Sequence, residues 1–148
     1  MGIFLFSLIS LYGCGLSDNF YNNQTKLSSS SDTWSVTNST QSIDDHTYNG
    51  CYNFTGYGTL WSYNSDEDKT ITAPYSLNVK SGQAKLILIT QDNEVSTILE
   101  NSKNTSVTEG TLDIHIKKGL NRIKFVGNEA DTELQITIEE GTLKTIDV

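Results

Sequence analysis

Alternation of apolar and polar residues with a period of two is the feature that most constrains the fold of this chain. In residues 111–117, Leu112, Ile114 and Ile116 share one face, whereas the residues between them are polar. Side chains alternate between the two faces of a β-strand, so this pattern predicts an antiparallel strand with one buried face and one solvated face. A helical period of 3.6 is hard to find over any helix-length window after Ser31. We therefore predict an all-β domain.

The same alternation recurs along the chain between turn residues. The run 84–90 is apolar at both parities, which predicts a central strand covered on both faces. Pro74 indicates an edge or a bulge, and Gly119 is expected to join 111–117 and 120–126 as a hairpin. About seven or eight short strands favour an antiparallel β-sandwich, jelly-roll-like, over residues 32–148. The other expected strands are 33–37, 48–63, 70–80, 95–99 and 132–139.

An apolar run extends from Ile3 to Tyr12. Its length of about ten residues suits the core of a signal peptide and is too short to cross a bilayer as a helix. The run ends in Leu11-Tyr12-Gly13-Cys14, which resembles the signal of bacterial lipoproteins. The resemblance implies a signal peptide over residues 1–13 and a lipid, detectable by palmitate labelling, on Cys14. We expect the chain to be held on the extracytoplasmic face of a bacterial cell membrane.

Residues 14–31 are mostly polar and rich in Ser and Asn. So few apolar residues do not repay the conformational entropy that folding costs. We therefore predict a flexible tether between the lipid and the domain. The first cationic residue is Lys26, so we also expect a basic segment upstream of Met1.

The charge balance limits the partners of the chain. Its formal net charge is −8, whereas nucleic acids and anionic lipid headgroups attract basic surfaces. We expect no nucleic acid partner, and membrane contact only through the lipid on Cys14. Cys51 is the other cysteine, so no internal disulfide is expected once Cys14 carries a lipid. No cofactor is expected.

Two segments carry a family resemblance: residues 81–89 (SGQAKLILI) and 118–127 (KGLNRIKFVG). They resemble small, functionally uncharacterised β-sandwich lipoproteins of Gram-positive bacteria, over roughly residues 52–140. The Gly-x-Asn-x-Ile portion is also similar to late strands of carbohydrate-binding jelly rolls. The resemblance implies the fold and the compartment, and it implies no site residues.

Aromatic residues gather between Tyr48 and Tyr63. On strict alternation Tyr57, Trp61 and Tyr63 face away from Tyr52, Phe54 and Leu60. An exposed aromatic ring offers an apolar face to the C–H groups of a sugar, so Tyr57, Trp61 and Tyr63 are the predicted ligand-binding residues. The alternative is that both sets pack in the sandwich, because a bulge near Gly56 and Gly58 brings them onto one face.

Motifs for catalysis are missing. The two histidines, His46 and His115, are too far apart in the sequence to form a metal-ligand motif. The sequence contains no nucleophile elbow and no phosphate-binding loop. Asp66 and Asp68 form a weak candidate for a Ca²⁺ site, since Ca²⁺ takes carboxylate oxygens. We therefore expect no enzyme, and no catalytic residue is assigned.

The favoured interpretation is a membrane-anchored, non-catalytic binding module with glycan as its leading ligand class. A structural or accessory envelope protein that contacts a protein partner is the alternative. A glycoside hydrolase is less favoured, because its paired carboxylates would have to converge in one cleft.

Overall fold

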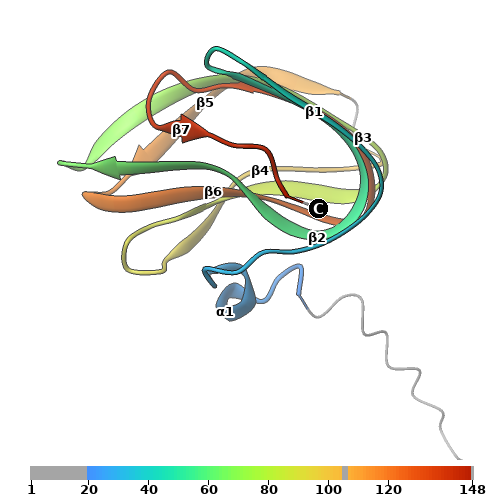
Figure 1. Ribbon diagram of the computed structural model, residues 1–148, viewed down its shortest axis with the longest axis horizontal. Helices are drawn as coiled ribbons and strands as arrows, with labels where there is room; N and C mark the ends of the chain where they lie inside the picture. The colour runs from blue at the N-terminus through green and yellow to red at the C-terminus, as the bar shows by residue number, and fades with distance from the viewer. Residues whose placement is uncertain (1–19, 105–106, 148) are drawn as a thin grey trace, which may run out of the picture.

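The structure, a computed structural model, describes residues 20–104 and 107–147. Within these residues the fold is nearly all antiparallel β, as predicted (Figure 1). No helix in the described part of the chain is long and apolar enough to cross a membrane. The elements are α1 (Gln24–Leu27), β1 (Thr33–Asp44), β2 (Thr47–Ser65), β3 (Lys69–Ile89), β4 (Val95–Ser102), β5 (Thr108–Ile116), β6 (Gly119–Thr137) and β7 (Thr142–Leu143).

A single sheet, folded over on itself, forms both layers of the sandwich. The strand order is β1-β2-β6-β3-β4, with β5 added to β3 and β7 to β2. The long strands β2, β3 and β6 each curve from one layer into the other (Figure 1). The first layer holds β1, β5 and one half of each long strand, and the second layer holds β4, β7 and the other halves.

Irregular backbone allows the long strands to bend. Register shifts occur between Phe54 and Gly56 in β2 and on both sides of Ser81 in β3. Gly56 has φ +135°, and a Cβ atom built there would lie 2.2 Å from the carbonyl oxygen of Thr33. Gly82 has φ +67° and is equally crowded by the backbone of β6. The crowding leaves no room for a side chain at either position, and the φ of Gly56 is one that glycine adopts without steric strain.

The core between the layers consists mainly of inward-facing residues of the long strands β2, β3 and β6. The sequence correctly predicts Ile114, Ile123, Phe125, Leu134 and Ile136 as inward residues, all of which are buried. Four aromatic rings, those of Trp34, Tyr52, Phe54 and Phe125, make stacked, tilted and edge-to-face contacts with one another. Aromatic contacts of this kind add to the stability gained from buried area.

The predicted hairpin between 111–117 and 120–126 is wrong. Strand β5 pairs with β3 in the first layer, whereas β6 starts in the second layer, so residues 117–119 cross between layers. The side chain of Asn121 holds this crossover by accepting from Lys117 N (3.0 Å) and donating to Lys117 O (2.7 Å). A turn glycine after an alternating strand therefore does not by itself identify the pairing partner.

The described part of the expected tether is ordered structure. Residues 20–32, here called the strap, run across the outer face of the second layer and include α1 (Figure 1). Tyr21 and Leu27 are 2% and 1% exposed, in a second apolar cluster with Ile87, Ile89 and Val126. The low apolar content of this stretch predicts a flexible tether, and that prediction is wrong for residues 20–31. A few large apolar side chains bury enough area to hold the segment on the sheet. The strap also explains why strand 84–90 is covered on both faces, as predicted.

Candidate functional site

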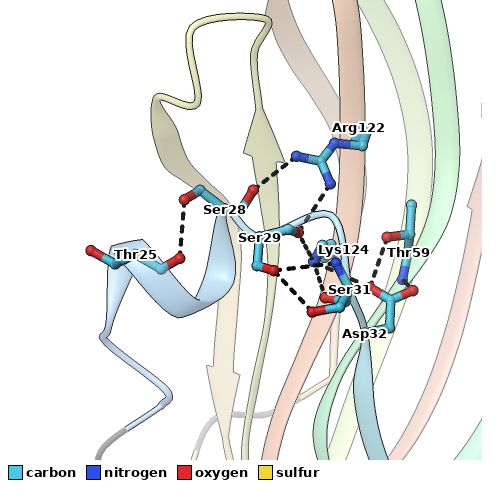
Figure 2. Close-up of polar contacts among 8 residues, drawn as sticks. All are labelled: Thr25, Ser28, Ser29, Ser31, Asp32, Thr59, Arg122 and Lys124. Atoms are coloured by element: carbon cyan, nitrogen blue, oxygen red, sulfur yellow. Dashed lines mark hydrogen bonds and ion pairs between the residues drawn. The ribbon is translucent and has the colours of Figure 1, made fainter.

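A buried cation on β6 attaches the strap to the sheet. The side chain of Lys124 is fully buried, although alternation predicts an outward position. Its Nζ donates to Ser29 O (2.7 Å) and Ser31 O (3.0 Å) and lies 3.2 Å from Asp32 Oδ1 (Figure 2). Three oxygen acceptors match the three N–H donors of an ammonium group. Lys124 therefore faces outward but is covered.

Two further cations continue this attachment. Arg122 donates from its two terminal nitrogens to Ser28 O (2.9 Å) and Ser29 O (3.1 Å), as Figure 2 shows. Lys85 of β3 donates to Asn22 Oδ1 (3.1 Å), and its Nζ lies 4.2 Å from the centre of the Tyr21 ring. The strap thus supplies mainly neutral oxygens to cations, so its attachment does not depend on ion pairs alone.

Asp32 is the anionic part of this attachment. Its carboxylate accepts from Thr59 N (2.9 Å) and Thr59 Oγ1 (3.0 Å) in addition to pairing with Lys124. Burial raises the pKa of Asp32, but the hydrogen bonds from Thr59 and Lys124 outweigh it and hold that pKa below its usual range. Burial lowers the pKa of Lys124, and its bond to Asp32 opposes that effect.

A groove opens between the strap and the adjoining strands β1 and β2. Its volume is about 520 Å³, which lies within the range of about 300–1,000 Å³ typical of ligand pockets. The rings of Phe20 and Tyr57 lie 6.1 Å apart, centre to centre, at an angle of 40°. The groove, as defined by the described residues, is lined by Phe20, Lys26, Thr33, Ser35, Thr55, Gly56 and Tyr57.

The lining of the groove combines apolar rings with short polar groups. Thr33, Ser35 and Thr55 bring hydroxyl groups, each of which donates and accepts hydrogen bonds. Lys26 is exposed, and its ammonium has no hydrogen bond or ion pair to any other residue of the described ranges. The described lining contains no Asp or Glu, so the pair of carboxylates that glycoside hydrolysis needs is not found there.

The structure places Tyr57 apart from Trp61 and Tyr63, whose rings lie 6.0 Å apart, centre to centre. Tyr57 lines the groove and is 7% exposed. Trp61 is fully buried in the core, and its Nε1 donates to Glu140 O (2.7 Å). Tyr63 packs partly against the core and accepts from Lys69 Nζ (3.1 Å).

A bulge explains why Trp61 does not face solvent. The pairing of β2 with β6 shifts register between Thr59 and Trp61, so the parity of the strand changes there. Leu60 and Trp61 are both fully buried as a result. The expectation that Trp61 faces solvent is therefore wrong, and the alternative of core packing applies to it.

The remaining candidates do not form a site with each other. Asp68 accepts from Lys118 N (2.7 Å) and lies 3.7 Å from Lys117 Nζ, while Asp66 is exposed. No group of three or more His, Cys, Asp or Glu side chains in the described ranges is arranged to hold a metal ion. Cys51 is free and exposed. Cys14 lies outside the described residues.

Sequence reasoning missed the strap side of the groove. Phe20 and Lys26 lie in a stretch whose composition predicts a tether. Thr33 and Ser35 lie in the strand predicted over residues 33–37, and no sequence pattern connects that strand with Tyr57. The missed signal is the pair Phe20-Tyr21, two large aromatic residues in a polar tract that ends at Ser31. Such a pair is able to bury enough apolar area to attach a short segment.

Comparison with known proteins gives loose structural likenesses. No protein-family model matches the chain, and no curated protein matches it. Among solved structures, a family 29 carbohydrate-binding module matches with a TM-score of 0.45 and 15% identity, covering 74% of this chain and 79% of that chain. A CBM29-2 variant complexed with mannohexaose matches with a TM-score of 0.44 and 14% identity, covering 74% of this chain and 94% of that chain.

Another CBM29-2 variant, complexed with cellulohexaose, gives a TM-score of 0.42 and 12% identity, covering 74% of this chain and 81% of that chain. These likenesses concern the fold alone.

Proposed function

We propose that this chain is a non-catalytic binding module that takes a glycan in the groove between the strap and β1–β2. The observation that carries the proposal is the pairing of two aromatic rings, Phe20 and Tyr57, beside three hydroxyl-bearing residues in one groove. A sugar ring presents C–H groups to an aromatic face and hydroxyl groups to polar neighbours. The described lining meets both needs.

The charge at the rim of the groove bears on the class of sugar. Lys26 adds a cation at the rim, so an acidic sugar is expected to bind more tightly than its neutral counterpart at low ionic strength. The groove therefore favours a polar, ring-containing ligand over a purely apolar one.

Ligand binding is tested on a glycan array, followed by calorimetry with the full chain. Phe20→Leu keeps the apolar volume and removes the aromatic face, so we expect at least a roughly tenfold loss of affinity, which corresponds to about 1.4 kcal/mol. Tyr75→Leu, an aromatic replacement away from the groove, is the matched control and should leave affinity unchanged. No glycan bound by the wild-type chain, or equal losses in both variants with unchanged melting temperatures, would reject the proposal.

We also propose that a lipid on Cys14 holds the module on the extracytoplasmic face of a bacterial cell membrane. The support is the motif Leu11-Tyr12-Gly13-Cys14 after an apolar run. Stable attachment takes two or more acyl chains, as a diacylglycerol supplies. In labelling with radioactive palmitate, Cys14→Ala should lose the label and Cys51→Ala should keep it. Label that persists on Cys14→Ala would contradict the proposed anchor.

A further inference from the structure

Strand β1 leaves one of its edges unpaired. It stands at the end of the strand order and pairs with β2 on one side, and no strand among the described residues pairs with its other side. A free edge presents a row of backbone N–H and C=O groups that are able to extend the sheet with another strand. Residues Asn38–Asp44 are the regular part of this edge, because the register with β2 shifts between Val36 and Asn38.

Within residues 38–44 this edge carries few of the features that usually prevent edge-to-edge pairing. Natural edge strands carry Pro, Lys or other charged residues, or a β-bulge, which in β1 lies before Asn38. Residues 38–44 (NSTQSID) contain a single charged side chain, Asp44, at the hairpin end. By comparison, β5, the edge strand on the other side of the same layer, has Glu109, Asp113 and His115 at exposed positions. Of these two edges, β1 is the less protected.

We infer that β1 pairs with β1 of a second copy of this chain, antiparallel, about a two-fold axis at Gln41. In this register Thr40 faces Ser42 of the other copy, and Ile43 faces Ser39. Ile43 is one of few large apolar residues of the described ranges that are exposed, at 37%. The pairing would cover Ile43 on both copies.

The charge distribution is compatible with this arrangement, although the net charge of −8 opposes association. Because the strands run antiparallel, Asp44 of each copy faces Asn38 of the other, whose amide is a donor for the carboxylate. The two Asp44 carboxylates then lie about six residues, or roughly 20 Å, apart. That distance exceeds the Debye length of about 8 Å at physiological ionic strength.

Pairing through β1 also affects the proposed function, on which this step rests. Thr33 and Ser35 belong to β1 and line the groove. A two-fold axis perpendicular to the sheet places the same face of both copies on one side of the joined sheet. The two grooves would therefore open on one continuous surface. A polymeric glycan that reaches both grooves would bind with avidity.

Self-association is measured without glycan, so its outcome is independent of ligand binding. A ladder of seven residues per copy is far smaller than a standard interface of about 1,600 Å², so we expect a weak dimer. In sedimentation equilibrium of the full chain from about 10 μM to about 1 mM, the average mass should rise from that of the 16.4 kDa monomer toward twice that value. A monomer throughout this range would overturn the inference.

Charge-swapped variants test the register. Thr40→Lys/Ser42→Lys and Thr40→Glu/Ser42→Glu each place like charges opposite one another across the two-fold axis, which should weaken self-association by roughly tenfold or more. Mixing the two variants should restore a dimer, now of unlike chains, which also shows that both fold. Thr72→Lys/Thr111→Lys adds the same charge to exposed positions on β3 and β5 and should associate as the wild type does.

Three results would overturn the proposed pairing. The first is self-association of either charged β1 variant at wild-type strength. The second is a mixture of the two variants that stays monomeric. The third is an equal loss in the Thr72→Lys/Thr111→Lys control, because that would assign the loss to net charge.

Discussion

Asp32 is expected to be the most sensitive single residue of the strap. In Asp32→Ala, Thr59 N and Oγ1 lose their acceptor, and Lys124 keeps only the carbonyl oxygens of Ser29 and Ser31. A buried donor without a partner costs about 1–3 kcal/mol, and a buried cation that loses its anion adds to that cost. We therefore expect the free energy of unfolding to fall by about 2–4 kcal/mol, and the melting temperature by roughly 6–12 °C.

The charge of Lys124 should account for part of this loss. Asp32→Ala/Lys124→Met removes the cation together with its anion, and replacing both members of a buried pair by apolar groups is often nearly neutral. We expect the double variant to regain about 1 kcal/mol or more over the single variant in urea denaturation at pH 7. A double variant that is no more stable than Asp32→Ala would refute the assignment of the loss to an unpaired buried charge.

Three further outcomes are expected in denaturation experiments. Gly56→Ala should lose more than about 2 kcal/mol through strain and overlap at the bend, whereas Gly110→Ala, whose added Cβ meets its nearest neighbour at 3.7 Å, should change stability by less than about 0.5 kcal/mol. Because the pKa of Asp32 is lowered in the folded state, its contribution is present above about pH 4 and is lost as the pH falls through that lowered value, so the stability difference between wild type and Asp32→Asn should shrink below about pH 4. Trp61→Phe should cost about 1–2 kcal/mol through the lost bond to Glu140 O and leave glycan affinity unchanged, and a selective loss of affinity would contradict its place in the core.

The alternation of apolar residues predicts the fold class because it reports directly on burial. Ile114, Ile123 and Leu134 are inward where period two places them. Strand pairing depends instead on where the chain crosses between layers, so residues 117–119, expected as a hairpin turn, cross from one layer to the other. Local pattern therefore predicts strands better than it predicts their partners.

The candidate site depends on a single bulge and on a few individual side-chain contacts, which neither the periodicity nor the composition of a segment reveals. One extra residue between Thr59 and Trp61 directs the indole of Trp61 into the core. The residue types in that stretch do not predict the bulge. The strap is attached by single contacts, such as those of Tyr21 and Lys124, between segments far apart in the sequence. Of the three predicted binding residues, Tyr57 lines the groove beside the strap.

The three strands that pass through both layers bear on how the molecule opens. Because β2, β3 and β6 are each shared, separating one layer breaks hydrogen bonds of strands that also hold the other layer. Native-state hydrogen exchange should therefore show one cooperative unit across both layers, with nearly equal protection for amides at the two ends of β6. The strap, joined to the sheet by side chains, should open separately and at lower free energy, so the groove can be lost while the sandwich stays folded.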